Sequence, residues 1–156
     1  MCGLLGMLTA HHNAVDFVPA IERALPCMRH RGPDEAGSWH DTDAVFGFNR
    51  LSIIDIAHSH QPLQWGPEGE PDRYAMTFNC EIYNYVELRK ELQNLGYTFN
   101  TSGDGEPILV GYHHWGKDVV KHLRGMFGIA IWDTKEKQLF LARDPFGIKP
   151  LYYATT

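Results

Sequence analysis

The segment from Met126 to Trp132 is a nearly continuous apolar run, and it constrains the fold more than any other part of the sequence. A strand that is apolar on both sides has to be buried on both faces. Residues Asp133 to Lys137 are typical of a turn, and Leu139 to Ala142 predict a return strand that completes an antiparallel hairpin. We therefore expect an antiparallel sheet that other elements cover.

Helices are the expected cover. Apolar residues recur at helical spacing over 15–28, although Pro26 should disturb the last turn. A second helix is predicted over 84–95, where Asn and Glu three residues apart form a capping-box pattern and a glycine follows the end. A third helix is expected after Asp104 and closes at Gly116.

Two further strands are predicted at 45–48 and 74–78, with a long surface loop rich in Pro and Gly over 58–72. Strands and helices follow one another without the regular βαβ alternation of a parallel fold. The 156 residues suit one domain. The residues alone thus predict an α+β domain with antiparallel sheet covered by helices.

Composition excludes several classes of function. The net charge is −5, and no cluster of Lys and Arg favours nucleic acid or an anionic membrane as a partner. No apolar run approaches the ~20 residues of a membrane span, and the N-terminus lacks the features of a secretory signal. Cys2, Cys27 and Cys80 are odd in number and widely spaced, which indicates reduced thiols in a cytoplasmic protein. The nine histidines lack metal-site spacing, so no metal is expected.

Cys2 is the most informative single residue. Initiator Met is generally removed before a small residue, and removal would give Cys2 a free α-amine. Such an amine has a pKa of roughly 7.7–8 and a thiol one of about 8.5, so one residue can supply both a nucleophile and a base. The alternative is a small apolar residue near a terminus, and Cys2 alone does not decide between the two.

Other polar residues suit the binding of an amino acid. Asn79 and the backbone N–H of Cys80 follow a predicted strand and would form an oxyanion hole, although a polar strand end explains them too. Arg50 suits bidentate capture of a carboxylate, or a surface position with its stem on the sheet. Glu81 and Asp104 suit an ammonium group; a solvated charge and a helix N-cap are the alternatives.

Six motifs together resemble one family, the N-terminal glutamine amidotransferase domain of glutamine-dependent asparagine synthetase. They occur in the family's order and run nearly from end to end of the chain. The segment 29–34 points to this branch over glucosamine-phosphate synthase or the phosphoribosyl amidotransferase. The motifs are Met1-Cys2-Gly3, Arg29-His30-Arg31-Gly32-Pro33-Asp34, Arg50-Leu51-Ser52-Ile53-Ile54-Asp55, Asn79-Cys80-Glu81-Ile82-Tyr83-Asn84, Gly103-Asp104-Gly105-Glu106 and the segment Arg143 to Tyr153.

The resemblance implies an N-terminal-nucleophile hydrolase fold, a four-layer αββα sandwich of two mainly antiparallel sheets. It implies that Cys2 attacks the glutamine side-chain amide to form a thioester that water hydrolyses. It also implies the roles of the site residues, with no metal among them. Asn79 and Cys80 form the oxyanion hole, Arg50 holds the α-carboxylate, the backbones of Leu51 and Ile53 line the pocket, and Glu81 and Asp104 hold the α-ammonium.

By the same resemblance, residues 1–156 are the glutaminase domain, and the ammonia passes to a C-terminal synthetase domain that this chain lacks. ATP and Mg belong to that domain, so no cofactor is expected here. The surface where it docks should be apolar and favour association, including a homo-oligomer. Position 80 departs from the family, which has Gly there. If its φ were positive, the Cys side chain would cost roughly 1–2 kcal/mol and tilt the N–H.

Three alternatives remain from the residues. A related amidotransferase could use the same domain with another ammonia acceptor, such as a peptide or a sugar. A module that binds glutamine without hydrolysis, or serves as a scaffold, is a second alternative that Cys80 or a retained Met1 would favour. A cysteine protease is a poorer alternative, because no histidine lies in a recognisable protease context.

Overall fold

The apolar run is one of the two inner strands of a four-stranded antiparallel sheet. A computed structural model describes residues 1–155, and the sheet has the order β4-β5-β6-β7. Its strands are β4 (Leu63–Trp65), β5 (Tyr74–Ile82), β6 (Gly125–Asp133) and β7 (Gln138–Arg143). The side chains from Phe127 to Asp133 are buried, and β6 pairs with β7 as the predicted hairpin. The prediction of a doubly covered strand is confirmed.

A second antiparallel sheet faces the first. It contains β1 (Gly3–Leu8), β2 (Glu35–His40) and β3 (Ala44–Arg50) in the order β1-β3-β2. Only β3 was expected from the sequence. The outer strands β1 and β2 lack a fully buried face, and their mixture of glycine, polar and apolar residues has no clean alternation.

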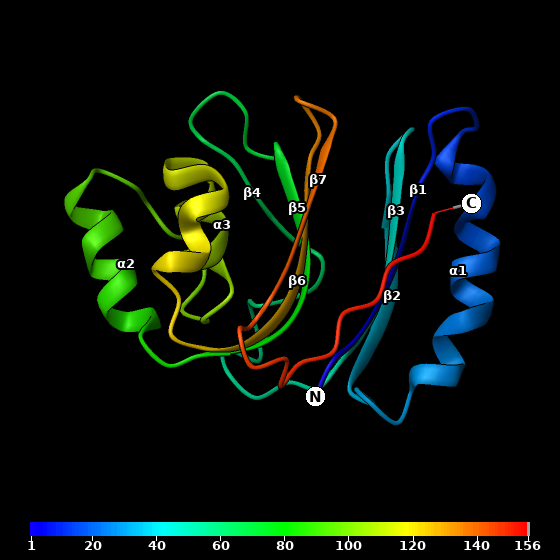
Figure 1. Cartoon of the computed structure of the whole chain (residues 1–156), viewed down its shortest axis with the longest axis horizontal. Coiled ribbons are helices and arrows are strands. Elements are labelled where there is room, and N and C mark those ends of the chain that lie inside the picture. Colours follow the sequence, from blue (N-terminus) through cyan, green and yellow to red (C-terminus); the bar gives the residue numbers. More distant parts are fainter. Residues whose placement is uncertain (156) are drawn as a thin grey trace.

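Helices cover the outer face of each sheet, so the molecule has the four layers that the resemblance implied (Figure 1). On one side lie α2 (Tyr85–Asn94) and α3 (Glu106–Trp115), followed by the 3-10 turn η3 (Gly116–Lys121). On the other side lies α1 (Val18–Ala24), flanked by the 3-10 turns η1 (Ala14–Phe17) and η2 (Leu25–Met28). The αββα prediction is confirmed.

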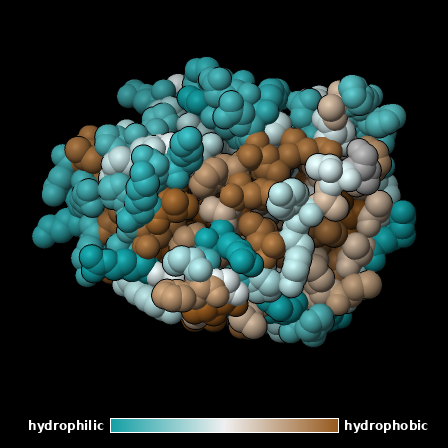
Figure 2. Space-filling view, viewed as in Figure 1, coloured by the Kyte–Doolittle hydropathy of each residue, from teal (hydrophilic) through white to brown (hydrophobic). Residues whose placement is uncertain are grey.

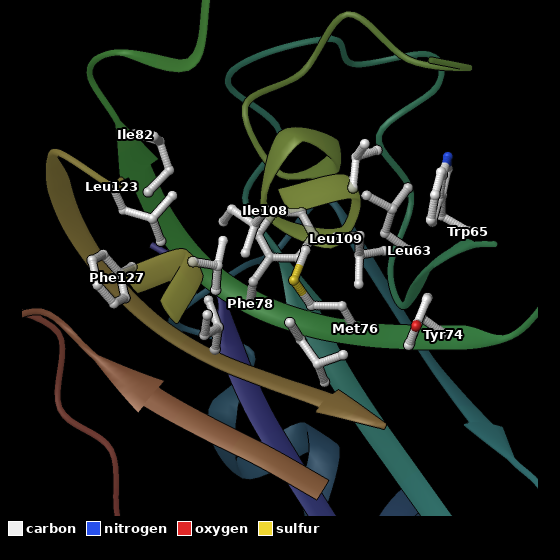
Figure 3. Close-up of a cluster of buried hydrophobic side chains, with 14 of the residues drawn as sticks. Leu63, Trp65, Tyr74, Met76, Phe78, Ile82, Ile108, Leu109, Leu123 and Phe127 are labelled. Carbon is white, nitrogen blue, oxygen red and sulfur yellow. The ribbon is translucent and has the colours of Figure 1, made fainter. Parts of the chain in front are cut away.

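The main core fills the space between α2, α3 and the four-stranded sheet. Figure 3 shows Ile108 and Leu109 of α3 meeting Met76 and Phe78 of β5. A smaller cluster that includes Phe46 and Trp132 lies between the two sheets. Because successive side chains of a strand point to opposite faces, β5 presents Phe78 to the helices and Asn79 to the other sheet. This alternation sets up the candidate site.

Several predicted elements need correction. The helix expected over 15–28 is α-helical only at Val18–Ala24, and a 3-10 turn that contains Pro26 replaces its end. Part of the predicted loop 58–72 is the short strand β4. Strand β5 runs on to Ile82, so the Asn79 motif lies within the strand and not after it.

The Asn84 side chain does not form the predicted capping box. It makes no cap hydrogen bond, and instead Nδ2 donates to His122 O (2.9 Å) while Oδ1 accepts the N–H of Arg124 (2.9 Å). The end of α2 at Gly96 is as expected, because that glycine has a φ of 96°. Within residues 1–155, no helix is both long and apolar enough to cross a membrane.

Candidate active site

One pocket brings together all of the predicted site residues. Its cavity measures about 60 Å³. The predicted residues that line it are Cys2, Arg50, Leu51, Ile53, Asn79, Cys80, Glu81 and Asp104. They come from the residue before β1, the end of β3 and the loop after it, the second half of β5 and the loop before α3. The stacking of the two sheets therefore brings together residues that lie about half the chain or more apart in the sequence.

Cys2 reaches the pocket because it directly precedes β1. The register of β1 with β3 pairs Gly3 with Asn49, which places Cys2 beside Arg50. The Cys2 thiol is half-buried and lies 3.9 Å from the carbonyl oxygen of Leu51. Met1 also lines the pocket, so the residue that must be removed to free the Cys2 amine is next to the site.

Arg50 is a buried cation whose guanidinium is partly engaged. Nη1 donates to Glu35 Oε2 (3.1 Å) and to the carbonyl of Ile56 (3.1 Å), and Nη2 donates to the carbonyl of Asp55 (3.1 Å). A guanidinium has donors on Nε and on both Nη atoms. Among the described residues, Nε and one Nη2 hydrogen of Arg50 have no acceptor, so they can meet an incoming carboxylate.

Asp55 joins the two halves of the pocket. It has a φ of 47°, in the left-handed region that Asp tolerates better than most residues. Its carboxylate accepts the backbone N–H of Ser102 (2.7 Å) and faces Nδ1 of His58 (2.9 Å). The Ser102 N–H, with a smaller contribution from His58, lowers the pKa of Asp55. The Arg50 loop is thereby fastened to the loop that carries Asp104.

The edge of β5 opposite β6 is open beyond the short pairing with β4. Backbone groups in an antiparallel strand alternate between its two neighbours. Phe78 N–H donates to Gln61 Oε1 (2.9 Å) and Ile82 N–H donates to Asp104 Oδ2 (3.0 Å), both on this open edge. Cys80 lies midway between them, so its N–H points to the same edge, into the pocket.

The backbone at Cys80 is ordinary. Among residues 1–155, only Asp55 and Lys137 combine a side chain with a positive φ. The strain considered for a side chain at position 80 therefore does not arise, because β5 stays extended through this residue. The Cys80 side chain packs against the main core, on the opposite face of the strand from Asn79.

The Cys80 thiol interacts with Asp104. Sγ donates to Asp104 Oδ2 at 3.4 Å. Burial, and then the Asp104 carboxylate, raise the pKa of the Cys80 thiol well above its ordinary value. Burial also raises the pKa of Asp104, although the Ile82 N–H and the Cys80 thiol oppose that rise. Asp104 is therefore a desolvated carboxylate on the pocket wall, and Gly105, not Asp104, is the N-cap of α3.

The comparisons decide the family. The whole chain, residues 1–156, matches the family described as glutamine amidotransferase domain. The chain belongs to that family. It is 61% identical to the putative asparagine synthetase [glutamine-hydrolyzing] of Mycobacterium tuberculosis (strain ATCC 25618 / H37Rv), over 99% of this chain and 26% of the relative. It is 47% identical to asparagine synthetase [glutamine-hydrolyzing] 1 of Bacillus subtilis (strain 168), over 99% of this chain and 24% of that relative.

The chain thus spans about a quarter of the length of these relatives. A solved structure, glutamine phosphoribosylpyrophosphate amidotransferase from B. subtilis complexed with ADP and GMP, has the same fold, with a TM-score of 0.72 and 20% identity. It matches 96% of this chain and 38% of that one. The predicted glutamine amidotransferase family is confirmed, and the relatives named above are asparagine synthetases. The predicted N-terminal-nucleophile fold is also confirmed.

Segment 29–34 of the amidotransferase domain lies outside the pocket and supports it. A Cβ at Gly32 would lie 2.3 Å from the carbonyl oxygen of Asn49, so only glycine permits this approach. Asp34 N–H donates to the carbonyl of Arg50 (3.1 Å), and the Asp34 carboxylate accepts the N–H of Ser52 (2.8 Å). The segment therefore holds the backbone around Arg50 in place.

Four buried residues of the pocket wall were not predicted as site residues, namely Ser59, Gln61, Phe78 and Lys149. Gln61 and Lys149 are 5% and 3% exposed, respectively. Gln61 lies in a stretch that resembles a surface loop, and Lys149 in the C-terminal motif, so neither pattern indicates a buried position. The only local sign for Gln61 is the proline that follows it, since Pro fixes its own φ and restricts the preceding residue.

Proposed function

We propose that this domain hydrolyses the side-chain amide of glutamine to glutamate and ammonia, with Cys2 as the nucleophile. The proposal rests on one observation, namely that a thiol, a buried guanidinium, a desolvated carboxylate and an outward-facing backbone N–H line the same pocket. Opposite charges at Arg50 and Asp104 suit the two charged groups of a free α-amino acid. The family assignment supports the same reaction.

Binding places the amide between Cys2 and Asn79. The free donors of Arg50 hold the α-carboxylate, Asp104 and Glu81 hold the α-ammonium, and the backbones of Leu51 and Ile53 line the pocket. Removal of Met1 then gives Cys2 its own base, because the α-nitrogen changes from an amide to an amine.

The chemistry proceeds by thioester formation. The Cys2 α-amine takes the thiol proton as Sγ attacks the amide carbon, and the carbonyl electron pair moves to oxygen. The Asn79 side-chain amide and the Cys80 N–H stabilise that oxyanion, as donors fixed before the reaction. The C–N bond then breaks, the proton passes from the α-amine to the departing nitrogen, and ammonia leaves. Water hydrolyses the thioester to glutamate and restores the thiol.

We further propose that, in a longer protein, a C-terminal synthetase domain uses this ammonia with aspartate, ATP and Mg to form asparagine. The names and greater lengths of the relatives support that assignment. Assay of the full-length protein with glutamine and aspartate should yield asparagine. Glutamine turnover that depends on a peptide or sugar instead of aspartate would identify another ammonia acceptor.

Glutamate release tests the glutaminase proposal directly. The protein should be shown by mass to lack Met1 and be compared with Cys2→Ala and with protein that retains Met1. We expect release only from the processed protein with Cys2, since the other two lack the nucleophile or the base. Saturable glutamine binding without release from processed protein would instead support a binding or scaffold role.

A further inference from the structure

We propose that Gln61 is a positioning residue for the oxyanion hole. The inference rests on the proposed glutaminase function and adds a residue to it. The Gln61 side chain takes the place of a neighbouring strand along the open edge of β5. In this way it aims the Cys80 N–H at the reacting carbonyl oxygen.

The Gln61 amide makes three hydrogen bonds to one short stretch of β5. Oε1 accepts the Phe78 N–H (2.9 Å) and the Thr77 hydroxyl (3.0 Å), and Nε2 donates to the Phe78 carbonyl (3.0 Å). Thr77 is 1% exposed and Gln61 is 5% exposed, so these bonds form away from solvent. A backbone strand would make the same pair of bonds to Phe78.

The position of these bonds gives them a consequence for Cys80. On the open edge, backbone groups of Phe78, Cys80 and Ile82 face outward in turn. The Gln61 side chain bonds to the backbone of Phe78, and the Asp104 carboxylate accepts the N–H of Ile82. These bonds hold the strand edge on both sides of Cys80. Within the described residues no protein acceptor takes the Cys80 N–H, which leaves that donor for a ligand.

Without Gln61, the backbone of Phe78 would lose both of its hydrogen bonds on the open edge, because the pairing with β4 already ends at Met76. Two buried backbone groups of Phe78 would then be unsatisfied, and the strand would shift to recover partners. Such a shift affects an oxyanion that exists only after attack, whereas Arg50 and Asp104 would still bind the ground-state substrate. Loss of Gln61 should therefore lower kcat and spare KM.

Steady-state kinetics of glutamate release by the Met1-free chain test this inference. Gln61→Met keeps the length of the side chain and removes all three bonds. Removing one oxyanion donor outright costs ~10²–10³-fold in kcat, so a displaced donor should cost roughly 10–100-fold, with KM changed by less than about threefold. Gln61→Glu keeps the acceptor for Phe78 N–H and loses the donor to Phe78 O, and its kcat should lie between the two.

Asn84→Leu is the matched control, because Asn84 also bridges two backbone groups with its amide, at His122 and Arg124. It should lose comparable stability in urea unfolding and retain the wild-type kcat. An aldehyde analogue of glutamine gives a second readout. The Cys2 thiol adds to the aldehyde carbon and the thiol proton reaches the oxygen, so Gln61→Met should weaken this adduct as much as it lowers kcat.

The outcomes are distinct. Three results would overturn the positioning role. They are a wild-type kcat in folded Gln61→Met, an equal loss of kcat in Asn84→Leu, and a change in KM as large as the change in kcat. If Gln61→Met does not fold, Gln61→Glu decides: wild-type kcat and wild-type aldehyde affinity in that variant would overturn the role. Absence of glutamate release from processed wild-type protein would count against the glutaminase proposal itself, whatever the variants do.

Discussion

At the scale of single residues, the side chain and the backbone N–H of Cys80 face different parts of the molecule. The thiol points to the core and Asp104, while the N–H points to the pocket. The sequence could identify the unusual residue but not its effect, because the sign of φ depends on how far β5 continues. Since β5 reaches Ile82, the thiol affects the site through Asp104 and not through a strained backbone.

Asp104 should make glutamine binding sensitive to mild acid. Binding of the α-ammonium needs the charged carboxylate, and burial raises the pKa of Asp104. As pH falls, protonation of Asp104 should therefore weaken binding at a higher pH than for an ordinary Asp, whose pKa is about 3.9. Calorimetric titration of glutamine into the Cys2→Ala protein across mildly acidic pH measures this without turnover.

Asp104→Asn should bind glutamine at least ~10-fold more weakly at neutral pH and lose the pH dependence, since it stays uncharged. An unchanged pH dependence in Asp104→Asn would assign the titration to another group.

At the scale of elements, helices and strands with a strong local apolar pattern were predicted correctly, and strands with a weak pattern were not. The hairpin of β6 and β7 and the helices α2 and α3 carry long, regular apolar patterns. Strands β1, β2 and β4 are short or lie at sheet edges, where tertiary pairing decides the structure. The resemblance supplied the predicted site residues, but it did not indicate that the Gln61 side chain takes the place of a neighbouring strand.

The loop after β3 should control affinity for glutamine through Asp55. Asp55→Ala loses the carboxylate that accepts the Ser102 N–H, and alanine tolerates a positive φ less well than aspartate does. The KM for glutamine should therefore rise roughly 10-fold or more in this variant. Asp55→Asn should stay near wild type, because Asn tolerates this conformation and can still accept the Ser102 N–H. Asp55→Gly keeps the backbone freedom alone and separates the two effects. Equal KM values for the Ala and Asn variants would show that Asp55 does not set the spacing of the pocket.

At the scale of the whole molecule, the segment after β7 presents apolar side chains to solvent. It leaves the four-stranded sheet and runs toward the α1 side (Figure 1), and apolar residues gather across the middle of the face in Figure 2. Phe146, Tyr152 and Tyr153 are 88%, 90% and 82% exposed. Large aromatic side chains that are exposed to this extent suit a contact with another domain or chain. Its exposure should therefore make the isolated domain associate with itself as concentration rises.

Sedimentation velocity over a concentration series measures that association. The double variant Phe146→Ser with Tyr152→Ser should sediment as a monomer at concentrations where the wild type does not, because the apolar contact area is reduced. Its free energy of unfolding should change by no more than about 0.5 kcal/mol per site, since both side chains are exposed.

Val86→Ser with Leu95→Ser is the matched control: these side chains, on and next to α2, are 58% and 52% exposed and lie on the other side of the molecule from α1. If the control lowers association as much as the test variant, or if the wild type is monomeric throughout, then this segment is not a self-association surface. A monomeric wild type would leave docking of a further domain as its expected use, because the relatives continue well beyond the length matched here.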